Sequence, residues 1–340
     1  MRVDGNIGET NDRAREGDLA VIDAETDAAE RIGYDGLWTT ETRHDPFLPL
    51  LRVAGRSSRI QVGTAIAVAF ARSPMTTATV ANDMQSYSGG RFTLGLGSQI
   101  KPHIERRFSM PWSSPAARMR EYVAAMRAIW ASWHSGEKLD FRGEFYQHTL
   151  MTPMFSPGPN PYGTPPVLIA AVGPQMTTTA AQVADGMLVH SFTTERYLRE
   201  VTLPQIASVR DPGGFTIAYP GLIAAGYDEP TLTAAVAAVR ERIAFYGSTP
   251  AYRGVLELHG WGELQTELQA LSKQGRWDEM TGLIEDPILH AFAVVGEPGQ
   301  VGKEIGRRFG GVVDRFTLYS PYPMSEAVAR AVASEVPREA

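Results

Sequence analysis

Ionisable residues cluster directly after a predicted strand over residues 36–40, where Glu41, Arg43, His44 and Asp45 follow one another closely. A carboxylate, a guanidinium and an imidazole in this arrangement could polarise or protonate a bound ring or substrate. The same residues also suit an ordinary ion pair between Glu41 and Arg43, with Asp45 capping the next helix. The sequence leaves both interpretations open.

A second polar segment follows the predicted strand over residues 92–96. Gly97 and Ser98 are succeeded by three basic side chains, at Lys101, Arg106 and Arg107. Glycines followed by polar and cationic groups favour a loop that meets a polar or anionic ligand. A turn with a solvated basic face is the alternative.

A third segment joins the apolar strand over residues 167–171 to a helix through Val172, Gly173, Pro174 and Gln175. Backbone N–H groups at a helix start have no partner within the helix, and the helix dipole favours negative charge there. The segment therefore suits a phosphate, although proline is also preferred at a first helical turn for structural reasons alone.

The predicted strand over residues 60–68 is rich in small residues, among them Gly63, Ala65 and Ala67. Small side chains would let a flat ligand approach the backbone closely. A core strand packed beneath helices has the same composition.

The elements that must position these segments alternate regularly between apolar runs and stretches with helical spacing. The predicted strands lie over residues 2–7, 36–40, 60–68, 92–96, 167–171, 187–190, 215–224 and 315–319. Near-continuous apolar strands are typical of parallel sheets covered on both faces. The alternation predicts an α/β fold, either a closed (β/α)8 barrel or a doubly wound sheet. Two longer regions, 139–164 and 249–289, suggest insertions that overhang a barrel mouth.

Composition and missing motifs exclude several classes of protein. The 340-residue chain has a formal net charge of −6 and no cysteine, which argues against nucleic-acid or membrane partners and against disulfides. No secretory signal or membrane span is evident, so a cytoplasmic location is expected. Gly95 and Gly97 match the start of a dinucleotide-binding glycine motif, but Ile100 stands where its third glycine belongs. The histidines lack metal-ligand spacing, so no metal is expected.

Taken together, the segments over residues 32–38, 59–64, 88–97, 170–175 and 184–186 resemble the bacterial luciferase-like superfamily. The resemblance spans nearly the whole chain, and the segments occur in the family's order. It implies a single luciferase-like (β/α)8 TIM-barrel domain over residues 1–340, with insertions at about 139–164 and 249–289. It also implies a homodimer or larger homo-oligomer.

Within this superfamily the chain is most similar to oxidoreductases that use the deazaflavin coenzyme F-420, through stretches 97–101, 192–198 and 258–262. The resemblance places the cofactor ring against Ala65 and Ile66, with a cis peptide between them. It assigns the remaining cofactor contacts to Gly97, Ser98, Lys101, Val172, Gly173, Pro174, Gln175, His190, Ser191 and Thr193.

The catalytic assignment departs from the family's pattern. Deazaflavin enzymes often carry an Asp-His pair after the second strand, where this chain has Glu41 and Thr42, with His44 two residues later. The proton donor stays open between Glu41, His44 and His103. Sugar-phosphate oxidation is disfavoured, because the sugar-phosphate dehydrogenases of the family carry a glutamate after strand four, and that place here falls on Ser98 or Gln99.

The expected function is hydride transfer between F-420 and a small organic substrate, with the chemistry residing mainly in the cofactor. An FMN-dependent luciferase-like monooxygenase is the alternative on the same barrel. A cofactor-binding homologue without turnover is the third hypothesis, because a fold does not dictate a function.

Overall fold

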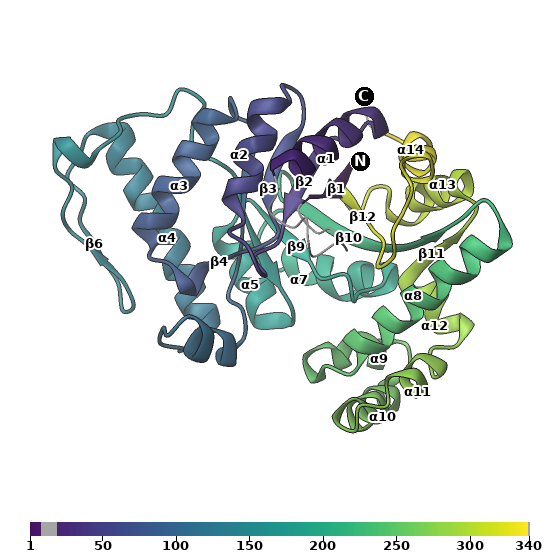
Figure 1. Ribbon diagram of the computed structural model, residues 1–340. Coiled ribbons are helices and arrows are strands. Elements are labelled where there is room, and N and C mark those ends of the chain that lie inside the picture. The colour runs from purple at the N-terminus through teal and green to yellow at the C-terminus, as the bar shows by residue number, and fades with distance from the viewer. Residues whose placement is uncertain (8–18, 339–340) are drawn as a thin grey trace.

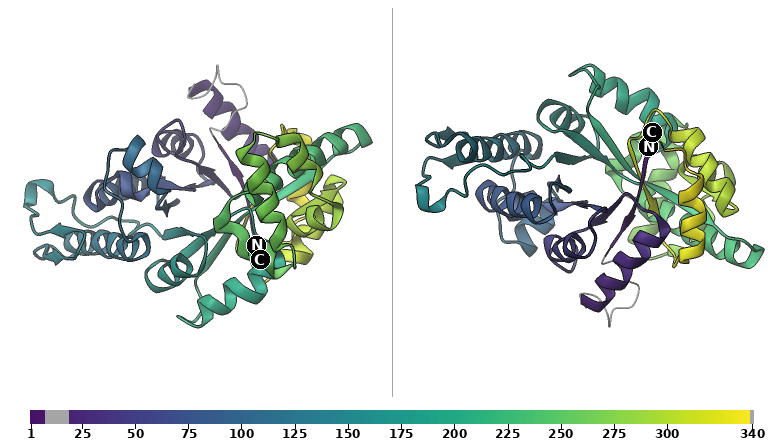
Figure 2. Two further views of the ribbon diagram at one scale, coloured as in Figure 1. Left: turned by 90° about the horizontal axis from the view of Figure 1, so that it is seen from below. Right: turned by 90° about the horizontal axis from the view of Figure 1, so that it is seen from above.

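The computed structural model describes residues 1–7 and 19–338. Its centre is a ring of parallel strands that closes on itself, because β10 pairs with both β9 and β12. In ring order the strands are β12 (Arg315–Tyr319), β1 (Arg2–Asn6), β2 (Gly36–Thr39), β3 (Gln61–Thr64), β5 (Phe92–Gly97), β8 (Val167–Ala171), β9 (Gly186–Val189) and β10 (Thr216–Ala225). The predicted (β/α)8 barrel is confirmed, and the doubly wound sheet is excluded (Figures 1 and 2).

The predicted strands match those of the ring, with two differences. The predicted strand over residues 60–68 is split into β3 and β4 (Ala67–Val68), which flank a cis peptide bond between Ala65 and Ile66. A further strand, β11 (Ala293–Gly296), pairs with the second half of β10 and was not predicted. Its Val294-Val295 pair, followed by Gly296, was the available signal.

Helices surround the barrel and connect its strands (Figure 1). They are α1 (Leu19–Ile32), α2 (Phe47–Arg56), α3 (Pro74–Tyr87), α4 (Pro115–Ser135), α5 (Pro174–Val183), α6 (Glu195–Tyr197), α7 (Leu203–Ala207), α8 (Glu229–Gly247), α9 (Arg253–Leu258), α10 (Gly262–Lys273), α11 (Trp277–Gly282), α12 (Asp286–Phe292), α13 (Pro298–Phe309) and α14 (Glu326–Glu335). In the described residues, no helix is both long and apolar enough to cross a membrane.

A buried ion pair closes the amino-terminal end of the barrel. Asp4 on β1 is fully buried and pairs with Arg315 on β12 at 2.7 Å, while the Trp38 indole N–H donates to the same carboxylate at 2.9 Å. Gly36 makes room for the guanidinium, since a Cβ there would lie 2.4 Å from an Arg315 nitrogen. The polar groups are mutually satisfied, as burial of charge requires.

The insertion over residues 139–164 lies along the outer helices and not over the mouth (Figure 1). Glu121 on α4 accepts hydrogen bonds from the backbone N–H groups of Glu144, Phe145 and Tyr146. Asn160 donates to Asn82 on α3. The expectation that this insertion overhangs the mouth is therefore wrong: its small hairpin, β6 (Phe141–Arg142) with β7 (Gln147–His148), is anchored to α4.

The insertion over residues 249–289 does reach the mouth. It folds into α9, α10, α11 and the start of α12, which pack against α8 around a second apolar core. Phe192, directly beyond β9, belongs to this core and stacks on Phe292 with ring centroids 4.4 Å apart. The insertion thus contacts the loop that follows β9, where a cofactor was expected.

Candidate functional site

The segments singled out by their chemistry lie at one end of the barrel. Glu41, Ser98, Gly173 and His190 each follow the carboxyl end of a ring strand, and every pairing in the ring is parallel. Parallel strands place their carboxyl ends at the same face of a barrel, where active sites of this fold are built. The barrel therefore brings these segments together at a single mouth.

An apolar cluster forms the floor of this mouth. Trp38, Leu168, Leu188 and Ala218 are buried there, and the partly exposed Ala65, Ile66 and Ala170 pack against them. We call these seven residues the apolar floor. The cis peptide expected between Ala65 and Ile66 is present in it. The arrangement offers an apolar surface beside strand three, where the cofactor ring was predicted.

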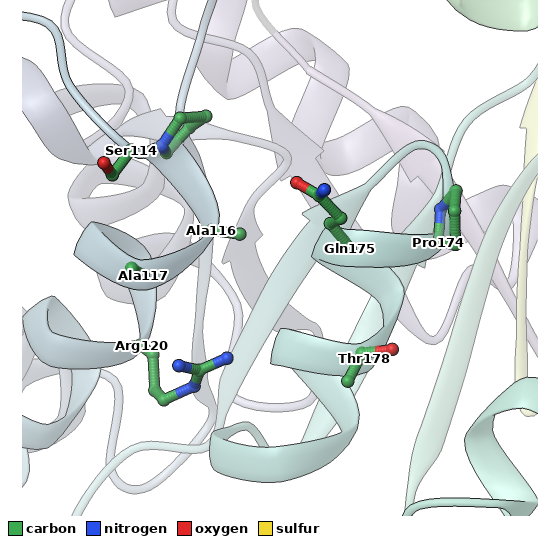
Figure 3. A pocket seen from close by; sticks show the side chains of 8 residues that line it. Ser114, Ala116, Ala117, Arg120, Pro174, Gln175 and Thr178 are labelled. Carbon is green, nitrogen blue, oxygen red and sulfur yellow. The ribbon is translucent and has the colours of Figure 1, made fainter.

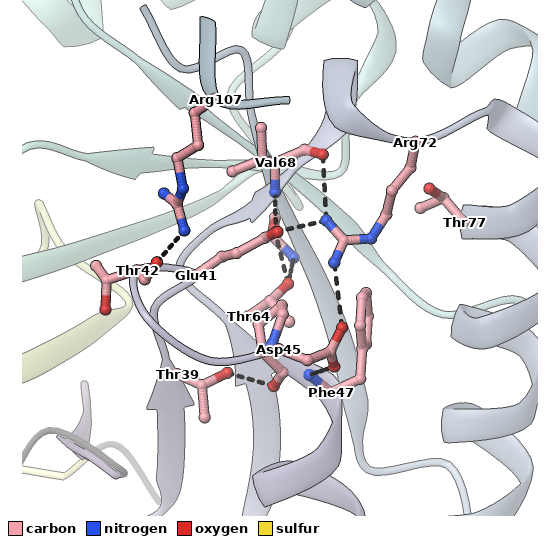
Figure 4. A network of polar contacts seen from close by, with 12 residues as sticks. Thr39, Glu41, Thr42, Asp45, Phe47, Thr64, Val68, Arg72, Thr77 and Arg107 are labelled. Atoms are coloured by element: carbon pink, nitrogen blue, oxygen red, sulfur yellow. Dashed lines mark hydrogen bonds and ion pairs between the residues drawn. The ribbon is translucent and has the colours of Figure 1, made fainter. Parts of the chain in front are cut away.

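Glu41 is held in a polar network that fixes the backbone next to the floor (Figure 4). Its Oε2 accepts from the Val68 backbone N–H at 2.7 Å and from the Arg72 guanidinium at 2.5 Å. Arg72 also pairs with Asp45 at 3.2 Å, and Asp45 caps α2 by accepting from the Phe47 N–H. Glu41 thus pairs with Arg72 and acts as an acceptor that ties β4 to the loop after β2.

The glycines of β5 serve the packing of the barrel. A Cβ at Gly95 would lie 1.8 Å from the Thr64 carbonyl oxygen, and one at Gly97 would lie 2.7 Å from the Ile66 side chain. Thr64 also exchanges hydrogen bonds with Gly95 through its hydroxyl. Gly97 therefore makes room for Ile66, which leaves that side chain at the edge of the floor.

A small hollow lies beside the floor, between the loops after β8 and β9. Its volume is about 50 Å³, and Gly173, His190, Thr193 and Tyr252 contribute to its lining. A space of this size holds at least one water molecule and suits a compact polar group. The amino terminus of α5 begins there, with Gly173 at its N-cap and φ of +76°.

His190 is the most strongly perturbed histidine at the mouth. Burial lowers its pKa from 6.5 to about 4, so the imidazole is neutral at physiological pH. Its ring stacks on Tyr252 with centroids 4.4 Å apart and meets Tyr246 edge-on at 4.8 Å. Its Nδ1 lies 3.0 Å from the Phe192 backbone nitrogen, and its Nε2 lies 3.0 Å from the Tyr252 hydroxyl.

A larger hollow of about 520 Å³ opens on the other side of the α5 amino terminus. Figure 3 shows Pro174 and Gln175 from α5 facing Ser114, Ala116 and Arg120 from the start of α4 across it. Gln175 and Gly173, expected to contact one phosphate, thus line different hollows. Val172 lines the small hollow and is partly exposed.

The two candidate histidines lie at different parts of the mouth. His44 is exposed and lines a hollow of about 560 Å³ with Arg43, Tyr319 and Tyr322. His103 is also exposed, and its Nδ1 lies 3.1 Å from Gln99 Oε1, which accepts from the Ile100 N–H as well. Because that oxygen accepts, Nδ1 of neutral His103 carries the proton and Nε2 is the basic nitrogen.

The remaining predicted residues occupy the loops around the mouth. Ser98 donates to the Gln99 carbonyl at 3.1 Å, and Lys101 is exposed and lies 3.8 Å from Glu105. Ser191 and Thr193 are buried after β9. The described residues contain no group of three side chains suited to hold a metal ion.

Sequence reasoning missed two residues of this site. Arg72 follows β4 by four positions, and a basic residue at the end of a small-residue strand was a usable signal for the partner of Glu41. Tyr252 comes from the insertion after α8 and meets His190 only in the folded chain. No local pattern distinguishes it from the neighbouring Tyr246.

Comparison with known proteins identifies the relatives of this chain. The family model described as "Luciferase-like monooxygenase" matches residues 6–315. The uncharacterized protein Rv1360 of Mycobacterium tuberculosis (strain ATCC 25618 / H37Rv) is 54% identical over 320 residues, covering 93% of this chain and 92% of that protein. The putative coenzyme F420-dependent oxidoreductase Rv3520c of the same strain is 26% identical over 298 residues, covering 82% and 84%.

Solved structures show the same fold. The coenzyme F420-dependent tetrahydromethanopterin reductase from Methanopyrus kandleri superposes with a TM-score of 0.78 at 20% identity, covering 99% of this chain and 98% of that one. The barrel fold thus agrees with the structure comparison. This chain belongs to the luciferase-like monooxygenase family.

Proposed function

We propose that this protein is an oxidoreductase that transfers a hydride between coenzyme F-420 and a small organic substrate. The observation that carries the proposal is the pairing of the apolar floor with the small hollow at the amino terminus of α5. A flat ring joined to a phosphate requires one apolar surface and one anion-binding pocket side by side. The similarity to a putative F420-dependent oxidoreductase supports the choice of cofactor.

The residues present fit such a group. Ala65, Ile66 and Ala170 are partly exposed at the top of the floor, so a ring face would complete their burial. A Cβ at Gly173 would meet no atom within 4 Å, so the space above this N-cap is open. The backbone N–H groups at the start of α5 would then face the phosphate.

The hydride chemistry belongs to F-420 when it is bound. The apolar floor would exclude water from the ring face that rests on it and would orient the ring. Glu41, paired with Arg72 and bonded to the Val68 N–H, holds β4 and thereby the floor's edge in place. Proton transfer then falls to His103, through its basic Nε2, or to His44.

The test is to titrate the cofactor-free protein with F-420 and with FMN separately and to measure both dissociation constants. We expect the tighter binding for F-420, followed by a change in F-420 absorbance with members of a panel of small alcohols and ketones. Tighter binding of FMN would favour the monooxygenase. Binding of F-420 without turnover on any substrate would favour a homologue that only binds the cofactor.

A pair of variants checks that binding occurs on the floor. Ala170→Glu places a charge on the apolar floor, whereas Ala131→Glu makes the same change on the exposed surface of α4. We expect A170E to lose F-420 binding because the carboxylate would be desolvated beneath the ring. A131E should bind like the wild type. Equal binding by both variants, with both shown to be folded by circular dichroism, would place the cofactor elsewhere.

A further inference from the structure

The direction of hydrogen bonding through His190 determines what Tyr252 can offer to a ligand. The Phe192 backbone N–H can only donate, and it points at Nδ1 of His190 at 3.0 Å. Nδ1 must therefore be the lone-pair nitrogen. A neutral imidazole with an unprotonated Nδ1 carries its proton on Nε2.

That proton is directed at Tyr252. Nε2 lies 3.0 Å from the Tyr252 hydroxyl oxygen, so in this tautomer His190 donates and Tyr252 accepts. The Tyr252 hydroxyl hydrogen is then left for a different acceptor. Burial raises the pKa of Tyr252 to about 12, so the phenol keeps that hydrogen at neutral pH. Among the described residues no acceptor for it is present besides Nε2, which is already protonated.

Tyr252 lines the small hollow, and its hydroxyl lies beside His190, which lines it too. Tyr252 and His190 line it together with Gly173 and Thr193, so a donor from the insertion and the amino terminus of α5 converge on the same space. Among the described residues, no acidic side chain contributes to this lining. The polar side chains of this described lining, such as Tyr252 and Thr193, thus offer hydrogen-bond donors with no carboxylate beside them, which favours an acceptor-rich ligand.

We infer that His190 orients Tyr252 to donate its hydroxyl hydrogen bond to an anionic oxygen, such as that of a phosphate, bound in the small hollow. Tyr252 is then a binding residue for the phosphate, and His190 is a positioning residue that acts through it. The inference deepens the proposed function and rests on it for the identity of the phosphate-bearing ligand. The insertion over residues 249–289 thereby contributes directly to the cofactor site.

Tyr246 supplies a matched control. It is also a tyrosine packed against the His190 ring, but its hydroxyl lies 3.2 Å from that of Tyr319 and it does not line the small hollow. Tyr252→Phe and Tyr246→Phe therefore remove the same atom from the same aromatic cluster. Only the first removes the proposed donor.

Two probes separate the inference from the proposed function. The first is F-420 compared with its phosphate-free fragment, consisting of the ring and its ribityl chain. We expect Y252F to reduce the preference for the phosphorylated form about tenfold or more, the effect of one lost hydrogen bond to a charged group. Y246F should keep the wild-type preference. An unchanged preference in Y252F would overturn the inference and leave the proposed cofactor intact.

The second probe is inorganic phosphate, titrated by NMR. Weaker phosphate binding in Y252F than in Y246F supports the inference even if F-420 does not bind, and in that case it is the proposed function that fails. The tautomer is read independently from long-range ¹H–¹⁵N correlations of His190. A protonated Nδ1 in the wild type would overturn the donor direction, whatever the binding data.

Discussion

Replacing Glu41 by Gln tests whether this carboxylate is a proton donor or the anchor of β4. Gln preserves the volume and one acceptor oxygen, so the hydrogen bond from the Val68 N–H can persist, but the ion pair with Arg72 is lost. Glu41 is 8% exposed and Arg72 20% exposed, so the pair is largely shielded from water. In E41Q the positive charge of the Arg72 guanidinium therefore stays shielded from water with less negative charge beside it.

The magnitude follows from the degree of burial. Removing one partner of a fully buried ion pair costs about 3–5 kcal/mol. The cost here should be lower, about 2 kcal/mol, because Arg72 retains Asp45 at 3.2 Å and some contact with solvent. With an unfolding entropy of about 2.1 cal/mol/K per residue, a loss of this size corresponds to a Tm decrease of about 3 °C for a chain of this length.

The assay is scanning calorimetry of the wild type, E41Q, R72M and the double variant. We expect each single change to destabilise the protein and the double change to cost less than their sum, because no unpaired charge remains. F-420 binding should weaken in both single variants, since both lose the ion pair that joins the loop after β2 to the segment following β4. Additive losses of stability would refute the coupling. A variant E41Q that binds F-420 normally but has no turnover, beside a fully active R72M, would instead make Glu41 the proton donor.

Four further predictions concern other parts of the site. The pKa of His190 falls from 6.5 to about 4 on folding, so between these pH values the unfolded state binds more protons than the folded state. With respect to His190, the folded protein therefore keeps its full stability above pH 6.5 and loses stability on acidification. The free energy of unfolding should drop by about 2 kcal/mol more between pH 7 and pH 5 in the wild type than in His190→Gln; an equal pH dependence in both proteins would contradict the lowered pKa. Gly173→Asp should weaken cofactor binding by about 2 kcal/mol, or thirtyfold, relative to Gly173→Ala, which carries the same strain at φ +76° without the charge; equal dissociation constants would place the phosphate elsewhere. Replacing the basic residues beyond β5, Lys101, Arg106 and Arg107, together with Gln should weaken the binding of F-420 more than that of FMN at low salt, and this difference should shrink as salt rises. Equal weakening of the binding of both cofactors would mean that these residues only solvate the turn. Hydrogen exchange of residues 139–164 should not change on cofactor binding, because this insertion is anchored to α3 and α4, and protection that appears with F-420 would count against the anchoring role.

Local patterns were sufficient to predict the scaffold of this protein. A parallel strand buried on both faces, such as Val167–Ala171, has a continuous run of apolar residues in its sequence. A helix such as Pro115–Ser135 has apolar residues at spacings of three and four. The same applies to the helix start at Gly173 and Pro174, because an N-cap is a property of adjacent residues. Short-range physics therefore predicted the strands of the ring and the loops at their ends. β11 was missed although its Val294-Val295 pair carries the same apolar signal.

Pairing between distant segments was decided only by the tertiary structure. The sequence offered Arg43 as the partner of Glu41, whereas the fold supplies Arg72 from the far end of strand three. The sequence suggested that the insertion over residues 139–164 overhangs the mouth, yet Glu121 binds its backbone to the outside of α4. The donor direction of Tyr252 depends on a histidine 62 residues away in the chain. Such contacts depend on where whole elements pack, and the free energy that selects them comes from burial and charge pairing across the fold, which no local window of sequence contains.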